Sequence, residues 1–166
     1  VDVSGTPNNP WLLSVDLNCR QIGADQSASG SVRSPFNKQS NLTTVNIGAD
    51  CKIIGKNAFL YRNNNGDVSS AGNHAISTLS GCSGVERIEA RAFRYHDITS
   101  QIELPEIQYL GKLAFEYNNF SEITFGQSLS WIEEDALANI FTLTKINYYR
   151  SSPPFTPLNP FGGSTP

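Results

Sequence analysis

The sequence predicts a mostly-β solenoid, in which about six units of 22–24 residues stack on one another through short strands and short helical turns. The first observation behind this prediction is an Ala-Phe dipeptide, or a substitute, whose second member recurs at intervals of 23, 34, 22, 22 and 24 residues. Its copies are Pro35-Phe36, Ala58-Phe59, Ala92-Phe93, Ala114-Phe115, Ala136-Leu137 and the degenerate Pro160-Phe161. Only the interval of 34 breaks the period, and an insertion rich in Asn, Gly and Ser at residues 61–73 accounts for it.

The second observation is a set of apolar positions at fixed offsets upstream of each dipeptide. Val45, Cys51, Ile54 and Ala58 lie at relative positions 0, 6, 9 and 13. The same offsets hold for Leu79, Val85, Ile88 and Ala92 and for Ile123, Leu129, Ile132 and Ala136, and the unit that starts at Ile102 fits with one residue deleted. Because no unit can close a core alone, we expect these positions to share one interior, filled by each Phe and closely packed at each Ala.

The elements follow in chain order from this pattern. A first strand is expected at residues 13–17, a Ser/Gly-rich loop at 24–34, and further units at 42–59, 76–93, 99–115 and 120–137. Alternation of apolar and polar residues predicts a short strand at the start of each unit, with its apolar side chains inward. Ser130 and Glu133 have capping-box spacing, which predicts a single helical turn through Ala138.

The whole chain, residues 1–166, is expected to form one domain. Residues 1–12, with Trp11, are assigned to an N-terminal cap, since the end of such a stack exposes an open core. Residues 13–149 form the repeats, and residues 150–166 form a C-terminal cap or tail. Prolines at positions 153, 154, 157 and 160 favour an extended conformation there.

The composition excludes several classes of partner. The net charge is -3 and only 16% of the residues are charged, with no cluster of Lys and Arg, which argues against nucleic acid and anionic membranes. No apolar run has the length of a transmembrane helix. The chain starts at Val1 without Met, so we expect a leader or upstream region to have been removed. Cys51 occupies an apolar repeat position and is expected to be a buried thiol; a bridge to Cys19 is geometrically conceivable but disfavoured.

The pattern L-x-x-I-x-I…V-x-x-I-G-x-x-A-F resembles the BspA-type (treponemal-type) leucine-rich repeat. The best matches are LTTVNIGADCKIIGKNAF at residues 42–59 and FSEITFGQSLSWIEEDAL at residues 120–137, and the resemblance covers roughly residues 13–161. It implies a right-handed leucine-rich-repeat stack and export to a bacterial cell surface, either secreted or on an anchor that this chain lacks. It also implies a non-catalytic role in adhesion, with host extracellular-matrix proteins, other bacteria or mucosal ligands as partners.

Residues with catalytic or metal-binding chemistry are few. His74 and His96 lie outside the apolar pattern and are expected to be exposed turn residues, without partners at zinc-ligand spacing. Asn63, Asn65 and Asp67 alternate oxygen ligands, but the Glu that a calcium loop needs is missing. The acidic run at residues 133–135 is explained by a solvated helix start, and residues 81–84 by a turn. We expect no catalytic residue, no metal site and no cofactor.

The outward face of the strands is the remaining candidate surface. By alternation its residues are Asp16, Thr44, Asn46, Ser80, Gln101, Glu103, Glu122, Thr124, Lys145 and Asn147, on adjacent rungs of one surface. Such a face is either a binding surface for an extended partner or a solvated sheet that keeps the molecule soluble.

Two other functions compete with protein binding. Glycan binding would need an aromatic platform such as Tyr61, Tyr95 or Trp131, and glycan hydrolysis would need two facing carboxylates about 5–10 Å apart. A structural spacer within a larger surface protein is the third hypothesis.

Overall fold

A computed structural model describes residues 12–23, 35–36, 39, 41–60, 76–152, 154 and 159–162. Nearly all regular structure in these residues is short strand, which confirms the mostly-β prediction. The longer strands are β1 (Ser14–Leu17), β3 (Thr44–Ile47), β5 (Thr78–Ser80), β7 (Ile102–Leu104), β9 (Glu122–Phe125) and β11 (Lys145–Tyr148). The two-residue strands are β2 (Gln21–Ile22), β4 (Ile53–Ile54), β6 (Arg87–Ile88), β8 (Tyr109–Leu110) and β10 (Trp131–Ile132).

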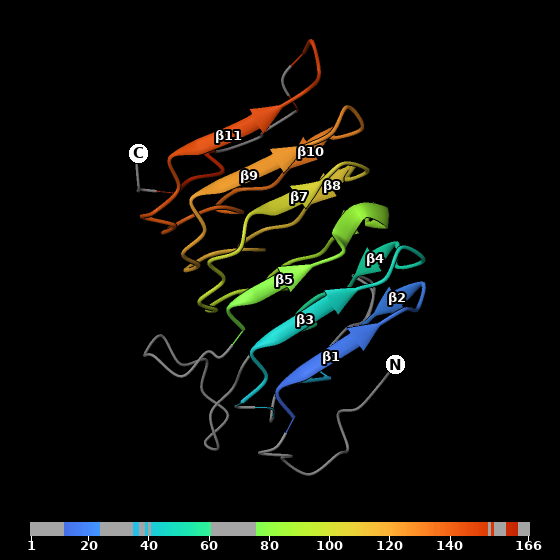
Figure 1. Cartoon of the computed structure of the whole chain (residues 1–166). Helices are drawn as coiled ribbons and strands as arrows, with labels where there is room; N and C mark the ends of the chain where they lie inside the picture. Colours follow the sequence, from blue (N-terminus) through green and yellow to red (C-terminus); the bar gives the residue numbers. More distant parts are fainter. Residues whose placement is uncertain are drawn as a thin grey trace.

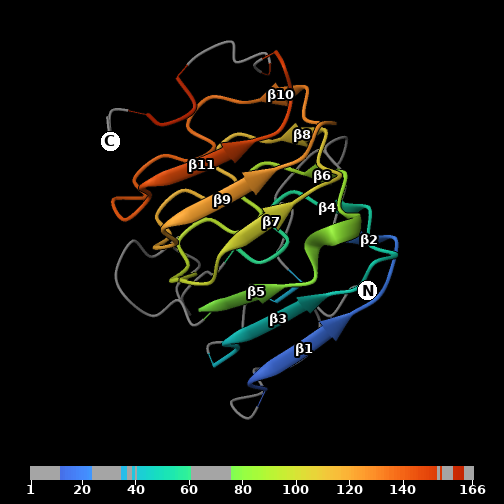
Figure 2. The ribbon, with the colours of Figure 1, turned by 45° about the horizontal axis from the view of Figure 1, so that its top comes forward.

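All strand pairs are parallel, and the strands of successive units lie next to each other in chain order (Figure 1). The two-residue strands form one five-stranded sheet in the order β10-β8-β6-β4-β2, here called the rear sheet. The longer strands form two separate three-stranded sheets, β1-β3-β5 and β11-β9-β7, here called the front sheets. Figure 2 shows the front sheets along one side of the molecule with the rear sheet behind them.

One hydrophobic interior fills the space between the front and rear sheets, as the repeat predicts. The four apolar positions that recur at offsets 0, 6, 9 and 13 are buried in all three of the aligned units. The rings of Phe36, Phe59, Phe93 and Phe115 stack in a column, with centroids 4.9, 4.9 and 5.3 Å apart. Phe36 also places the first unit in this column, and β1 pairs with β3 in register.

The segments that follow the rear strands are turns, so the helical turn expected after Glu133 is wrong. Asp135 has φ 59°, and Asn57, Arg91 and Leu113 have the same left-handed conformation one residue before the Ala of their units. A left-handed residue interrupts an α-helix. The turns instead bond between units: Phe59 N donates to Ala92 O at 2.9 Å and Phe93 N to Ala114 O at 2.8 Å. Ser130 Oγ donates to Gln108 O rather than capping a helix.

Other expectations have mixed outcomes. The turn expected at residues 81–84 is a single turn of 3-10 helix, η1 (Cys82–Gly84). His96 is buried at 6% exposure, so the expectation of an exposed turn residue is wrong; its Nε2 lies 2.7 Å from the carbonyl oxygen of Phe59, one unit earlier. Cys19, Cys51 and Cys82 are free thiols. Burial raises the pKa of Cys51 to about 11, in keeping with the expected inert thiol.

Several sequence-based assignments fall outside the described residues. These are the cap residue Trp11, the insertion at 61–73 with its candidate calcium ligands, His74, and the prolines at 153 and 157. Among the residues that the structure describes, no helix has the length and apolar character needed to cross a membrane. The same part of the chain holds no group of three or more His, Cys, Asp or Glu side chains placed to bind a metal ion.

Candidate functional site

The outward residues of the front sheets form the front face, in two rows set by the strand register. One row contains Ser14, Thr44 and Thr78, and continues with Gln101, Glu122 and Lys145. The other contains Asp16, Asn46, Ser80, Glu103, Thr124 and Asn147. All ten sequence-predicted residues lie on this face. The alternation rule extends to Ser14 and Thr78, which sequence reasoning had left out.

The C-terminal half of the front face is bound into a network around Glu122. Lys145 Nζ donates to Glu122 Oε1 at 2.8 Å, and Asn147 Nδ2 donates to the same oxygen and to Thr124 Oγ1 at 3.1 Å. The hydrogen bonds from Lys145 and Asn147 hold the pKa of Glu122 below its ordinary value, while Glu122 raises the pKa of Lys145. Gln101 Nε2 reaches Glu122 Oε2 at 3.4 Å. The charge of Glu122 is therefore already matched within the chain.

The expected row of adjacent rungs is interrupted between Ser80 and Gln101, where β5 and β7 do not pair. After β3 and β9, the next residue donates its amide to the preceding unit: Gly48 N to Leu17 O at 2.7 Å, and Gly126 N to Leu104 O at 3.1 Å. In the register of the C-terminal front sheet, Pro105 occupies the position of Gly126. Proline has no amide hydrogen, so this bond cannot form after β7.

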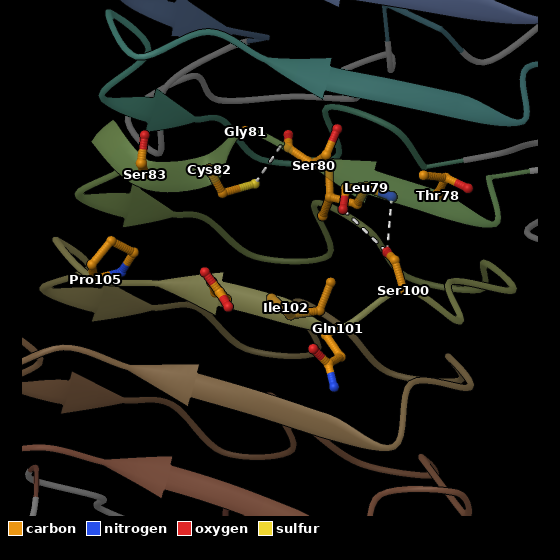
Figure 3. Close-up of a pocket in the computed structure, with 11 residues that line it drawn as sticks. Thr78, Leu79, Ser80, Gly81, Cys82, Ser83, Ser100, Gln101, Ile102 and Pro105 are labelled. Atoms are coloured by element: carbon orange, nitrogen blue, oxygen red, sulfur yellow. Dashed lines mark hydrogen bonds between the residues drawn. The ribbon is translucent and has the colours of Figure 1, made fainter.

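Ser100 occupies the gap between β5 and β7. Leu79 N donates to Ser100 Oγ at 3.1 Å, and Ser100 Oγ donates back to Leu79 O at the same distance, as Figure 3 shows. A side-chain hydroxyl thus takes both backbone groups of Leu79 that a neighbouring strand would have used. The two strands are held together at this point by a side chain, and the backbone ladder is absent.

A groove of about 340 Å³ opens along this gap. It is lined on the β5 side by residues 78–83, which run from the strand into η1, and on the β7 side by residues 100–103 and Pro105 (Figure 3). Its volume is at the lower end of the range for ligand pockets, about 300–1,000 Å³. The lining combines apolar groups with the hydroxyls of Thr78, Ser80 and Ser83. The break in the sheet therefore gives the front face a concave feature.

The sequence profile of the BspA type Leucine rich repeat region matches this chain in six copies, over residues 18–66 and 69–153. The chain belongs to the BspA-type leucine-rich repeat family. Comparison with curated proteins and with solved structures gives no match. Leucine-rich repeats commonly mediate protein interactions and are generally non-catalytic, and BspA-type proteins are typically secreted or located on bacterial surfaces.

Aromatic residues of this BspA-type chain gather away from the front face. On the rear sheet, Trp131 Nε1 donates to Glu133 Oε1 at 2.8 Å, and Tyr109 Oη donates to the same oxygen at 3.3 Å. The guanidinium of Arg87 lies 4.2 Å from the centroid of the Tyr109 ring. Burial and the charge of Glu133 raise the pKa of Tyr109 to about 12.

The other two candidates for an aromatic platform do not join Trp131. Tyr95 lies in the turn after β6 and stacks on Tyr117, with ring centroids 5.0 Å apart. Tyr61 lies outside the described residues. Tyr95 and Trp131 therefore provide no common platform beside the front-face groove.

Proposed function

We propose that this chain is a non-catalytic binding module of an exported bacterial surface protein, which holds a protein partner on its front face and serves in adhesion. Under this proposal, the repeat units form a single right-handed solenoid domain, and the front face is its extended binding surface. The observation that carries the proposal is the groove, because it gives the front face a hollow with the exposed carboxylate of Glu103 in its lining. Host extracellular-matrix proteins, or another surface protein, are the proposed partners.

The charges of the front face support binding of a partner over a purely solvated sheet. Glu103 is exposed, and it has no hydrogen-bond or ion-pair partner among the residues that the structure describes. Asp16 is exposed at the other end of the face. The face thus keeps free carboxylates that a partner with basic groups can match.

The test is surface plasmon resonance against a panel of purified extracellular-matrix proteins. We expect at least one of them to bind the wild-type chain and to lose affinity for the variant Glu103→Gln/Glu122→Gln. The matched control is Glu86→Gln/Glu106→Gln. Glu86 matches Glu122 because each is paired with a lysine, Lys52 at 3.4 Å and Lys145 at 2.8 Å. Glu106 matches Glu103 because both are exposed. Equal losses in both variants, or no binding by the wild type, would contradict the proposal.

Glycan binding is the second candidate, and the rear-sheet cluster is the observation that favours it. An aromatic ring beside carboxylate and guanidinium groups, as at Trp131, Glu133 and Arg87, is a combination that can hold a sugar. A glycan array on the wild-type chain and on Trp131→Ala distinguishes this candidate from the first. A hit that disappears in Trp131→Ala would move the binding site to the rear sheet.

A structural spacer is the third candidate, favoured by the uncovered interior beside β11. Ile146 is 41% exposed, whereas Ile123, its partner in β9, is fully buried. An apolar edge of this kind suits stacking of a further unit or domain. Failure of both binding screens, with a folded chain, would leave the spacer as the remaining function.

A further inference from the structure

We propose that the groove between β5 and β7 is a subsite for the basic side chain of a lysine or arginine on an extended partner segment. This inference rests on the proposed function, because it assigns the chemistry of one position on the front face. The groove arises from Pro105 and Ser100, which distinguish this unit from the other units of the chain.

The polar groups of the groove favour a cation. Of the described residues that line it, Glu103 alone carries a charge. Thr78, Ser80 and Ser83 add hydroxyl groups to the lining. A carboxylate and hydroxyl groups can accept hydrogen bonds, and an ammonium or guanidinium group supplies only donors.

The apolar part of the lining matches the aliphatic stem of such a side chain. Leu79, Ile102 and Pro105 contribute carbon surface beside the polar groups. Lysine and arginine bury their methylene groups along apolar surface while the charged end remains at a polar rim. An anionic group finds no match here, since no Lys or Arg is among the described lining residues.

The depth of the break limits the occupant to a side chain and excludes a whole inserted strand. At the start of the gap, Thr99 N donates to Ser77 O at 3.0 Å, so the two units are in direct contact there. Behind the gap, β6 and β8 remain paired, with Arg87 opposite Tyr109 and Ile88 opposite Leu110. An additional strand would need both contacts to separate, because neighbouring strands lie about 4.8 Å apart.

The experiment is a titration of the ¹⁵N-labelled full chain followed by heteronuclear NMR. The probes are N-acetyl-arginine amide, its lysine analogue, the neutral citrulline analogue and a methyl galactoside. We expect the two cationic probes to shift the amide signals of residues 78–83 and 100–104, and the citrulline analogue to leave them nearly unchanged. Added salt should weaken the binding of the cationic probes only.

The matched variants are Glu103→Gln and Glu106→Gln, both at exposed positions: Glu103 lies in β7 and Glu106 in the turn that follows it. Glu103→Gln should lower the affinity for N-acetyl-arginine amide by roughly fivefold, as expected for a solvent-accessible ion pair, and Glu106→Gln should leave it unchanged. Equal shifts with the citrulline analogue, equal losses in the two variants, or binding of the methyl galactoside instead would overturn the proposal.

These probes separate the failure of this inference from the failure of the proposed function. Absence of probe binding, with matrix proteins still bound through the front face, would remove the subsite and keep the function. Probe binding in the groove without any matrix partner would keep the subsite and contradict the proposed class of partner.

Discussion

The rear sheet is continuous through five units, whereas the front strands are divided into two sheets. Each of these five units supplies both a front strand and a rear strand. The continuity of each sheet therefore depends on how neighbouring units meet on that side of the molecule. In the unit of β7, Ile107 follows Ile102 by five positions, whereas in the preceding unit Val85 follows Leu79 by six. The rear strands regain register after this deletion, because Ile88 and Leu110 are fixed by the interior. Connector length alone does not divide the front face, because β7 pairs with β9, whose unit has the longer connector. The division lies on the β5 side of β7, where the Ser100 hydroxyl takes the backbone groups of Leu79.

The largest effect is expected for the aromatic column, which crosses the break through the contact of Phe93 with Phe115. Phe115→Ala should lower the free energy of unfolding by about 3–5 kcal/mol, through lost burial and the cavity left behind. Urea denaturation followed by circular dichroism measures this, with Phe115→Leu as the milder control because Leu137 takes the same repeat position. If wild-type unfolding showed two separate transitions, the halves on each side of the break would not share one interior.

A second substitution tests the rear sheet. A Cβ at Gly111 would lie 2.6 Å from the backbone nitrogen of Ala90 and 2.7 Å from the carbonyl carbon of Glu89. Gly111→Ala should therefore force the units apart and cost about 1–3 kcal/mol of stability. Gln108→Ala, at an exposed position three residues earlier, should change stability by no more than about 0.5 kcal/mol. A neutral Gly111→Ala would show that the rear sheet is not the tightly held part of the molecule.

The third substitution acts on the front break itself. Ser100→Ala removes the hydroxyl that serves both backbone groups of Leu79, and should cost about 1 kcal/mol. It should also increase hydrogen exchange at the Leu79 amide. Ser77→Ala is the control, since its hydroxyl makes one 3.4 Å bond to Thr43 O on the paired side of β5. Equal costs for the two variants would mean that Ser100 has no special part in holding the break.

The repeat spacing predicted the buried positions, the shared interior filled by the Phe rings and the outward residues of the front face, because these depend on a local period. The division of the front face depends on contacts between units, and the repeat spacing does not specify those contacts. The missing amide of Pro105 can be read from the sequence, but the bond of the Ser100 hydroxyl to Leu79 depends on how two units meet. His96 shows the same limit: it is buried because the Phe59 carbonyl of another unit lies within hydrogen-bond distance. The helical turn was predicted wrongly because the left-handed position of Asp135 is occupied by Arg91 and Leu113 in other units, so no shared residue type marks it.

The pKa of Tyr109 provides a smaller test, confined to the rear sheet. Burial, followed by the charge of Glu133, raises this pKa from 10.0 to about 12. The folded chain then keeps the phenol proton to higher pH than the unfolded chain, so this contribution to stability is complete below pH 10 and lost as the pH rises toward 12. An ultraviolet titration of wild type and Glu133→Gln should show a lower Tyr109 pKa in the variant. An unchanged pKa would place Glu133 away from the phenol in solution.

The smallest effect is expected in hydrogen exchange at single amides on the two sides of β7. Amides along a strand in a parallel sheet alternate between its two neighbours. Because Gly126 N donates to Leu104 O, the Thr124 amide, two residues earlier, also points from β9 toward β7. By the same alternation, the amide of Glu103 points toward β5, where no ladder exists. We therefore expect a low protection factor at the Glu103 amide and a high one at the Thr124 amide, although the two residues are register partners in neighbouring front strands. Equal protection would require a β5–β7 ladder in solution, which would close the groove and leave the front and rear sheets equally continuous.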